Sequence, residues 1–394
     1  MTNDKNLAEQ LIQRARELVP VLKSRAAETE ALGQLPEATI ADFQEAGFFR
    51  ICQPKRWGGY ELDPSVFFDV QITLAEGCMS SAWVLGVVAI HNWQMALFDD
   101  RAAQEVWGDD SSVLISSSYM PVGKVTRVEG GFKLSGRWGF SSGSKHCKWV
   151  FLGAMIPPEN EDEGPDMRTF LLPISDYSIE DNWDVMGLKG TGSHDIVVDD
   201  VFVAEYRTHK ALDGFTMMSP GNEVNTAPLF KIPFGQIFVR AVCSSSIGAL
   251  QGAIDDYCEV TGNRVGINDG KKTAIDPVAQ MVLAEASVVV DELKLVLHRN
   301  FDRMMDAARG AESLTMDERV KMRFDSALVS EKCVRAMDDL MGCAGASGMF
   351  NSHPFNRVFR DLHSGRGHVA NTPGKFGRNW GAVQLGLDNE DFFL

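Results

Sequence analysis

The sequence predicts a mainly α-helical protein with a β-rich middle section, because the spacing of its apolar residues changes twice along the chain. Apolar residues recur every three or four positions over roughly the first 110 residues, alternate in short runs after that, and return to helical spacing from about residue 236. We therefore expect an N-terminal helical domain (1–111), a central β domain (112–207) and a C-terminal helical bundle (208–394).

Helices dominate the prediction for the first segment. Apolar residues share one face of a helix over residues 5–31, in which Pro20 is expected to cause a kink or an interruption. Pro36 suits the first turn of a second helix. The run Leu74–Trp93 is apolar throughout and predicts one long buried helix.

Strand-like runs mark the central segment. Gly130 and Gly131 join two alternating runs, which is typical of a β-hairpin. Further strands are expected at Trp149–Ile156, Thr169–Leu172 and Asp195–Val203.

Capping residues indicate where the last helices begin. Asp276 stands before Pro277, a pair that suits the N-cap and first position of a helix. Thr315 and Glu318 have the spacing of a capping box at the start of a helix that runs toward Met341.

Composition excludes several classes of function. The chain has 394 residues, with 38 Lys plus Arg against 54 Asp plus Glu and a formal charge of -16, so a nucleic-acid partner is not expected. Apolar stretches such as Trp83–Ile90 are much shorter than the ~20 residues that span a bilayer, so we expect no membrane association. The first residues do not resemble a secretory signal, and the seven cysteines form no C-x-x-C pair, so we expect a reduced cytoplasmic protein without a metal site.

Two histidines stand in unusual local sequence. His91 follows an apolar helical run, two residues before Trp93, and is either a buried histidine bonded to a backbone carbonyl or a base that faces an aromatic pocket. His368 lies in a glycine-rich approach to the last helices, where a solvated loop histidine and a catalytic one are both open.

Small hydroxyl residues gather at two places in the central segment. Ser116–Ser118 precede Tyr119, and Ser141–Ser144 follow Phe140. Each run is either a polar strand edge or a set of donors for the edge of a flat ring that stacks on an aromatic side chain. The small-residue bend Gly342–Gly348 is open to close helix packing as well as to ligand contact.

Three short motifs, in this order and spacing, resemble landmarks of the acyl-CoA dehydrogenase superfamily. They are Pro54–Gly59, Met186–Thr191 leading into Val201–Val203, and Arg357–Asp361. The resemblance implies a helical domain, a β-barrel-like domain and a four-helix bundle, assembled as a homotetramer. The dehydrogenases of that superfamily use a glutamate in a stretch that corresponds here to Gly367–Thr372, which contains no carboxylate, so dehydrogenase chemistry is disfavoured.

Other segments resemble group D two-component flavin-dependent monooxygenases, whose members include the 4-hydroxyphenylacetate 3-hydroxylase and 3-HSA hydroxylase oxygenase components. These segments are Val88–Phe98, Ile115–Pro121 and Asn225–Gly235. In that group a separate NAD(P)H-dependent flavin reductase supplies reduced FMN or FAD as a diffusible cosubstrate, which reacts with O2 to form a C4a-hydroperoxyflavin. The resemblance implies hydroxylation of a phenolic or other aromatic substrate, with an N- or S-oxygenase or an indole-type monooxygenase as the alternative.

The resemblance also assigns residues. His91 matches the histidine beside the substrate phenol and His368 the one beside the flavin hydroperoxide, while Ser117 places a hydroxyl near flavin N5. Trp93 and Tyr119 are expected to line the substrate pocket. Flavin contacts are implied for Trp83, Ser117, Ser142, Arg264, Ala346 and Ser347, with Arg264 as a bidentate partner of the flavin phosphate.

Three positions depart from the family pattern. Gly235 and Ala370 replace the arginine and tyrosine that bind the substrate carboxylate in the hydroxyphenylacetate enzyme, so a larger or neutral aromatic substrate is favoured. Gly266 stands where the family often has an arginine, which leaves the choice between FMN and FAD open.

Overall fold

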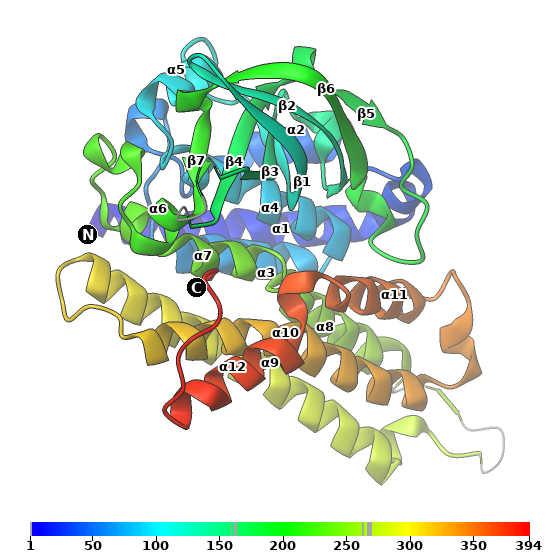
Figure 1. Ribbon diagram of the computed structural model, residues 1–394. Helices are drawn as coiled ribbons and strands as arrows, with labels where there is room; N and C mark the ends of the chain where they lie inside the picture. Colours follow the sequence, from blue (N-terminus) through cyan, green and yellow to red (C-terminus); the bar gives the residue numbers. More distant parts are fainter. Residues whose placement is uncertain (1, 159, 161–163, 262–263, 266–269) are drawn as a thin grey trace.

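The computed structural model describes residues 2–158, 160, 164–261, 264–265 and 270–394. A seven-stranded sheet lies above a layer of helices from the first segment, and the helices of the last segment lie below that layer (Figure 1). The three segments of the sequence therefore follow one another through the molecule, and the first helices contact both of the others.

The first segment forms helices whose burial increases along the chain. Their bounds are α1 Thr2–Leu32, α2 Glu37–Ala46, α3 Pro64–Ala75, α4 Met79–Met95 and α5 Asp100–Trp107. All residues of α4 are buried. Because α4 is enclosed on every side, it has no polar face, and its few polar side chains must find partners inside the protein.

The expected interruption of the first helix at Pro20 is wrong, whereas a kink there stays a prediction. The helix continues through the proline without interruption. Pro20 lies on the exposed side of α1, where water can bind the backbone carbonyl that loses its intrahelical N–H partner.

The predicted single helix Leu74–Trp93 is wrong, since the structure divides it between α3 and α4. A side chain at Gly77 would collide with the backbone carbonyl of Val19 in α1. The chain turns at this close approach between backbones, which only glycine permits.

The strands form one sheet in the order β5-β6-β2-β1-β3-β4-β7. Their bounds are β1 Ile115–Val128, β2 Gly131–Ser141, β3 Trp149–Ile156, β4 Asp166–Pro173, β5 Ser178–Glu180, β6 His194–Ala204 and β7 Thr208–Lys210. The predicted hairpin is confirmed, with Val128 opposite Gly131 in antiparallel β1 and β2. The start of β1 pairs in parallel with β3, so Ser117 lies opposite Phe151 beside the helical layer.

The last segment is helical apart from short connections. Its helices are α6 Ala211–Thr216, α7 Phe234–Ala241, α8 Ser245–Asp256, α9 Pro277–Ala308, α10 Met316–Ala344, α11 Pro354–Arg366 and α12 Pro373–Gln384. Both predicted caps are confirmed: Asp276 accepts a hydrogen bond from the Val278 amide at 2.8 Å. Thr315 and Glu318 form the capping box of α10.

The last segment contains a longer apolar stretch than those considered in the sequence analysis. Among the described residues, Phe234–Val260 is long and apolar enough to cross a membrane by composition, with a mean hydropathy of 1.4 over its most apolar window. The fold buries 94% of that window. Its composition is therefore accounted for by its position in the protein core.

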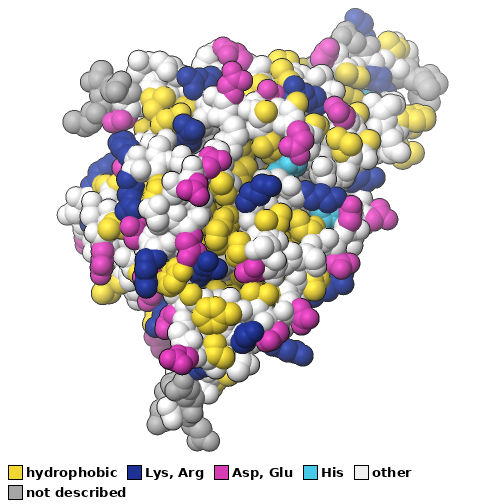
Figure 2. Space-filling view, turned by 90° about the horizontal axis from the view of Figure 1, so that it is seen from above, with side chains coloured by type: hydrophobic (Ala, Val, Ile, Leu, Met, Phe, Trp, Pro, Cys, Tyr) yellow, Lys and Arg dark blue, Asp and Glu magenta, His cyan; other side chains and the backbone are white. Residues whose placement is uncertain are grey.

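The surface seen in Figure 2 mixes charges of both signs. Lys and Arg side chains lie among Asp and Glu side chains on this face, and hydrophobic side chains gather in a strip between them. On the face shown, no broad basic area stands out, in keeping with the overall charge of -16.

Two glycines provide a matched test of helix packing. Gly248 lies in α8, where an added Cβ would overlap the carbonyl oxygen of Ile72 in α3, whereas Gly381 lies in α12 with nothing within 4 Å of an added Cβ. Gly248→Ala should lower the free energy of unfolding by about 1–3 kcal/mol because the helices must move apart. Gly381→Ala should leave it unchanged or raise it by up to about 1 kcal/mol. Chemical denaturation checks both, and equal effects would contradict the packing argument.

Candidate active site

His91 lies at the junction between α4 and β1. Its Nδ1 atom is 2.6 Å from the backbone carbonyl oxygen of Ile115. A carbonyl oxygen can only accept, so Nδ1 carries the proton and Nε2 presents a lone pair. Nε2 is buried and has no hydrogen-bond partner among the described residues.

Burial also fixes the charge of His91. The side chain is fully enclosed, and this burial lowers the pKa of His91 to about 4, partly opposed by the bond to Ile115. The imidazole is therefore neutral near pH 7 and able to accept one hydrogen bond at Nε2.

Aromatic rings surround this acceptor. The His91 ring is 5.6 Å from the ring of Phe151, at 90°, and 6.1 Å from the ring of Tyr119. Tyr119 is in turn 4.8 Å from Phe238 and 5.8 Å from Phe234, and Phe234 stacks on Trp93 at 6.1 Å. The predicted residues Trp93 and Tyr119 thus belong to one aromatic wall next to His91.

The hydroxyl of Tyr119 is held by polar neighbours. It donates to the side-chain carbonyl of Gln94, one helical turn after His91. Burial raises the pKa of Tyr119, while hydrogen bonding with Ser117 and Gln94 acts in the opposite direction. Tyr119 therefore stays protonated, and its hydroxyl links the predicted residue Ser117 to the wall.

Trp83, Ser142 and His368 form a second group. The indole Nε1 of Trp83 donates to Ser142 Oγ at 3.3 Å, and the Trp83 ring lies 5.9 Å from the imidazole of His368. Ser142 Oγ is also 2.8 Å from Ser193 Oγ. Three segments distant in sequence thus place an indole, an imidazole and hydroxyl groups together.

His368 has a defined tautomer. Its Nδ1 accepts the backbone N–H of Ala370 at 3.1 Å, so in the neutral ring the proton is on Nε2, which can donate. Enclosure by surrounding groups lowers the pKa of His368 to about 4, and the positive charge of Arg323 adds to this effect. His91 and His368 are both neutral near pH 7, one with an acceptor and the other with a donor at Nε2.

Arg264, Ala346 and Ser347 lie together in a different part of the chain. Arg264 donates to the backbone carbonyl of Cys343 at 3.1 Å, and its guanidinium lies against Gly345. Ser347 Oγ bonds to the Ala344 carbonyl at 3.3 Å. Among the described residues, no hydrogen bond joins these three to Trp83 or His91. Gly266 lies outside the described residues.

Some members of these groups were not singled out from the sequence. Gln94 follows His91 by three positions on α4, and this helical spacing was a usable signal. Thr191 and Ser193 extend the hydroxyl chain from Ser142, with 2.7 Å between their Oγ atoms. Thr191 and Ser193 stand on either side of Gly192, in a run of small and polar residues like Ser141–Ser144.

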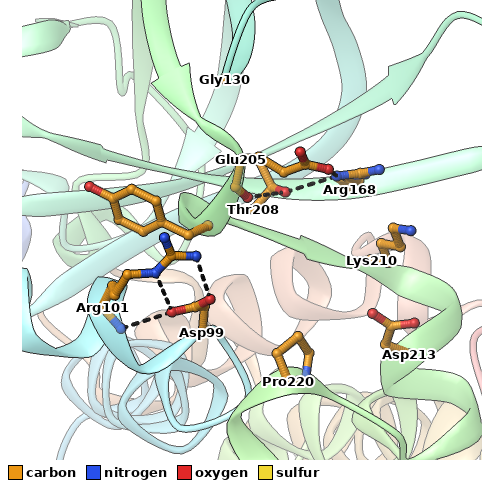
Figure 3. Close-up of a pocket in the computed structure, with 10 residues that line it drawn as sticks. Asp99, Arg101, Gly130, Arg168, Glu205, Thr208, Lys210, Asp213 and Pro220 are labelled. Atoms are coloured by element: carbon orange, nitrogen blue, oxygen red, sulfur yellow. Dashed lines mark hydrogen bonds and ion pairs between the residues drawn. The ribbon is translucent and has the colours of Figure 1, made fainter.

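A hollow of about 500 Å³ lies elsewhere, between the sheet and α5, α6 and the turn at Pro220. Two of the cations that line it are paired with acids: Arg101 pairs with Asp99 at 2.8 Å, and Arg168 pairs with Glu205 at 3.4 Å, while Lys210 also lines the hollow (Figure 3). Paired charges leave little capacity for an ionic ligand. This hollow contains none of the predicted site residues.

The grouped side chains suit a flat heteroaromatic cofactor. Trp83 offers a ring, Ser142 a hydroxyl and His368 an N–H, and none of the three is a carboxylate. Ser117, next to Tyr119 in the other group, offers a further hydroxyl. These types match a flavin ring, which has donors and acceptors along one edge. Within the described part of the chain, no three His, Cys, Asp or Glu side chains are close enough to hold a metal ion.

Comparison with known proteins agrees with these features. Residues 6–107 match the family described as Acyl-CoA dehydrogenase, N-terminal domain, and residues 241–373 match Acyl-CoA dehydrogenase, C-terminal domain. The chain is 38% identical over 96% of its length to the flavin-dependent monooxygenase, oxygenase subunit HsaA of Rhodococcus jostii, covering 99% of that protein. It is 31% identical to the FADH(2)-dependent resorcinol hydroxylase, oxygenase component, of a Rhizobium species, covering 96% of this chain and 94% of that protein.

A solved structure shows the same likeness in three dimensions. The crystal structure of 3-HSA hydroxylase from Rhodococcus sp. RHA1 superposes with a TM-score of 0.93 at 36% identity, covering 98% of this chain and 99% of that chain.

The neutral state of His91 has a measurable consequence for stability. Between pH 6.5 and about 4 the unfolded chain binds a proton at this histidine and the folded protein does not, so acidification through this window destabilises the fold. His91→Gln should reduce the slope of the free energy of unfolding against pH, by up to the contribution of one bound proton. Burial also lowers the pKa of His209 to about 4. His209→Gln should therefore reduce the slope by a similar amount. Urea titrations at several pH values measure both, and an unchanged slope for His91→Gln would contradict the assignment.

Proposed function

The chain belongs to the acyl-CoA dehydrogenase fold family, in its branch of flavin-dependent monooxygenase oxygenase subunits, and on that premise we propose that it hydroxylates an uncharged phenol beside the phenolic hydroxyl. The observation that carries the proposal is the unpartnered, unprotonated Nε2 of the buried His91. A phenol hydroxyl supplies the single donor that this atom lacks.

His91 acts on the phenol as a hydrogen-bond acceptor and base. A free phenol has a pKa of about 10, so it is protonated near pH 7, and the low pKa of His91 makes complete deprotonation before the reaction unfavourable. The Nε2 lone pair instead accepts the phenol hydrogen bond and takes the proton as the new C–O bond forms and the hydroxyl becomes more acidic. This proton transfer raises the electron density at the ring carbon beside the phenolic oxygen as the new C–O bond forms.

In this proposal Trp83, Ser142, Ser117 and His368 would hold the flavin. When bound in its reduced form, it supplies two electrons and, with O2, the electrophilic oxygen atom, and the second oxygen leaves as water. The Nε2–H of His368 would serve as a hydrogen-bond donor to the reacting oxygen, and the Ser117 hydroxyl would serve as a donor to the flavin. The buried walls exclude water, which limits loss of the oxygen as H2O2.

Arg264, Ala346 and Ser347 are proposed to bind the phosphate end of a flavin held mainly by a neighbouring copy. The guanidinium of Arg264, held at the Cys343 carbonyl, supports this assignment because it supplies a positive charge for that phosphate. The assembly proposed is a homotetramer. Exposed apolar side chains on α9 support it, namely Val278, Met281, Val288 and Leu295.

The remaining components follow from the same proposal. A separate NAD(P)H-dependent reductase supplies reduced FMN or FAD, and the enzyme acts in the cytoplasm. The domain division 1–111, 112–207 and 208–394 is retained as a proposal.

The direct test mixes reduced FAD or FMN with O2 and a series of phenols and quantifies catechol-type products and H2O2. Product in amounts comparable to the flavin oxidised supports the proposal. Formation of H2O2 alone with every phenol would refute it. Thioether and indole substrates in the same series test the heteroatom and heteroaromatic alternatives, which do not require a phenolic proton acceptor.

Removal of the base should separate ring hydroxylation from flavin oxidation. His91→Gln should lower the rate of phenol hydroxylation by about 10²–10⁴-fold, while reduced flavin still reacts with O2 to give H2O2. His298→Gln is the control, because the partly exposed His298 of α9 bonds to Asp69 of α3 at 3.0 Å, and neither residue belongs to the site described above. Equal hydroxylation by wild type and His91→Gln would remove His91 from the mechanism.

The substrate should carry no negative charge. A Cβ on Gly235 would lie 2.5 Å from the carbonyl oxygen of Phe393, so an arginine cannot serve as a carboxylate anchor at this position in the present backbone. Burial of an unpaired carboxylate is costly. We expect 4-hydroxyphenylacetamide to exceed 4-hydroxyphenylacetate in kcat/KM by at least about tenfold, which corresponds to 1.4 kcal/mol. Preference for the carboxylate would contradict this assignment.

A further inference from the structure

The last ten residues of the sequence, 385–394, run back across the helical bundle after α12 and are called the tail segment here. Figure 1 shows it, in red, ending beside α7. Its exposure changes sharply along its length: Leu385 is 85% exposed and Phe392 60%, whereas Leu394 is 0% exposed. The end of the tail segment is therefore inserted in the protein.

Hydrogen bonds fix the path of the tail segment. Asn379 of α12 donates to the Asn389 side chain at 2.8 Å, and Asn389 donates to the Asp391 carbonyl at 2.7 Å. The Asp391 carboxylate then accepts the Phe393 amide at 3.1 Å. These bonds turn the chain toward α7.

Arg319 of α10 holds the inserted end. Its Nη2 donates to the backbone carbonyl of Leu394 at 2.5 Å and to that of Phe215 at 2.8 Å, and its guanidinium lies 4.3 Å from the centre of the Phe215 ring. Arg319 is only 6% exposed. One buried cation thus ties the tail segment to α6.

The tail backbone and α7 touch at Gly235. An added Cβ there would lie 2.5 Å from the Phe393 oxygen and 2.9 Å from the Leu394 nitrogen, closer than side-chain carbons approach backbone atoms. The tail segment consequently passes through space that any side chain at position 235 would need.

Phe393 packs on the wall beside the proposed base. Its ring is 5.4 Å from Phe234 and 6.2 Å from Phe238, both edge to face. These two rings are the ones that contact Tyr119, which contacts His91. Phe393 is therefore one layer behind the surface that faces a phenol.

We propose that the tail segment is a structural brace for the substrate pocket and that Phe393 is a positioning residue, which holds Phe234 and Phe238 in the place where they select the phenol. The inference rests on the proposed function and extends it to a segment outside the site. The brace holds the ring of a small uncharged phenol against Tyr119 and keeps its hydroxyl on His91 Nε2. When the brace is loosened, reduced flavin and O2 still yield oxidised flavin and H2O2, and fewer turnovers yield hydroxylated phenol.

The test compares two adjacent phenylalanines. Phe393→Ala should raise KM for a small phenol by about 3- to 10-fold and lower the product formed per O2 consumed. It should also reduce the ratio of kcat/KM for small phenols to kcat/KM for bulky para-substituted phenols. Phe392→Ala removes an exposed ring and should leave all three quantities within about twofold of wild type. Phe393→Leu should restore most of the coupling because it refills the space. Equal behaviour of the two alanine variants overturns the inference.

Two further measurements keep the test decisive. The dissociation constant of a phenol without flavin, measured by tryptophan fluorescence, should rise in Phe393→Ala even if wild type forms no hydroxylated product, so failure of the brace and failure of the proposed reaction are distinguishable. Arg319→Lys keeps the charge but cannot reach both carbonyls, and it should shift coupling in the same direction as Phe393→Ala. An unchanged product yield per O2 in a folded Arg319→Lys protein would also count against the brace.

Discussion

The hydrogen bond from His91 to the Ile115 carbonyl joins the buried helix α4 to the first residue of the sheet. It does two things at once. It satisfies a backbone acceptor at the point where the helical and β segments meet, and it decides which nitrogen of the imidazole carries the proton. Because the bond is buried, any movement of β1 away from α4 leaves a buried donor and a buried acceptor unpaired, which costs several times the net value of the bond. The position of the sheet and the chemistry of the histidine therefore depend on one another.

The neutral state of the two histidines depends on their enclosure by the surrounding protein. His91 and His368 remain neutral because their surroundings penalise charge, and opposite tautomers give one an acceptor and the other a donor. Neither histidine has a carboxylate among its hydrogen-bond partners in the described part of the chain. The neutral pair does require that the rings around it stay packed, since entry of water would return both imidazoles toward their ordinary titration.

Much of the fold was predictable because it follows local rules. The Asp276 and Thr315 caps and the Gly130–Gly131 hairpin depend on residues only a few positions apart, and all three were confirmed. The break between α3 and α4 was missed because Gly77 packs against the backbone of Val19, more than fifty positions earlier in the chain. For the site, the sequence indicated His91, Tyr119 and Trp93 as members of an aromatic pocket, but Phe393 and Arg319 act through contacts across the whole chain, and no local pattern announces them.

The contact between Gly235 and the tail backbone constrains how this protein can change over evolutionary time. A side chain gained at position 235 is incompatible with the present course of residues 393 and 394, so the two features cannot be altered one at a time without passing through a poorly packed intermediate. A lineage that acquires a charged anchor there must first release or reroute its last residues, and one that keeps the tail in place stays confined to glycine. The order of substitutions is thereby partly set by a single van der Waals contact.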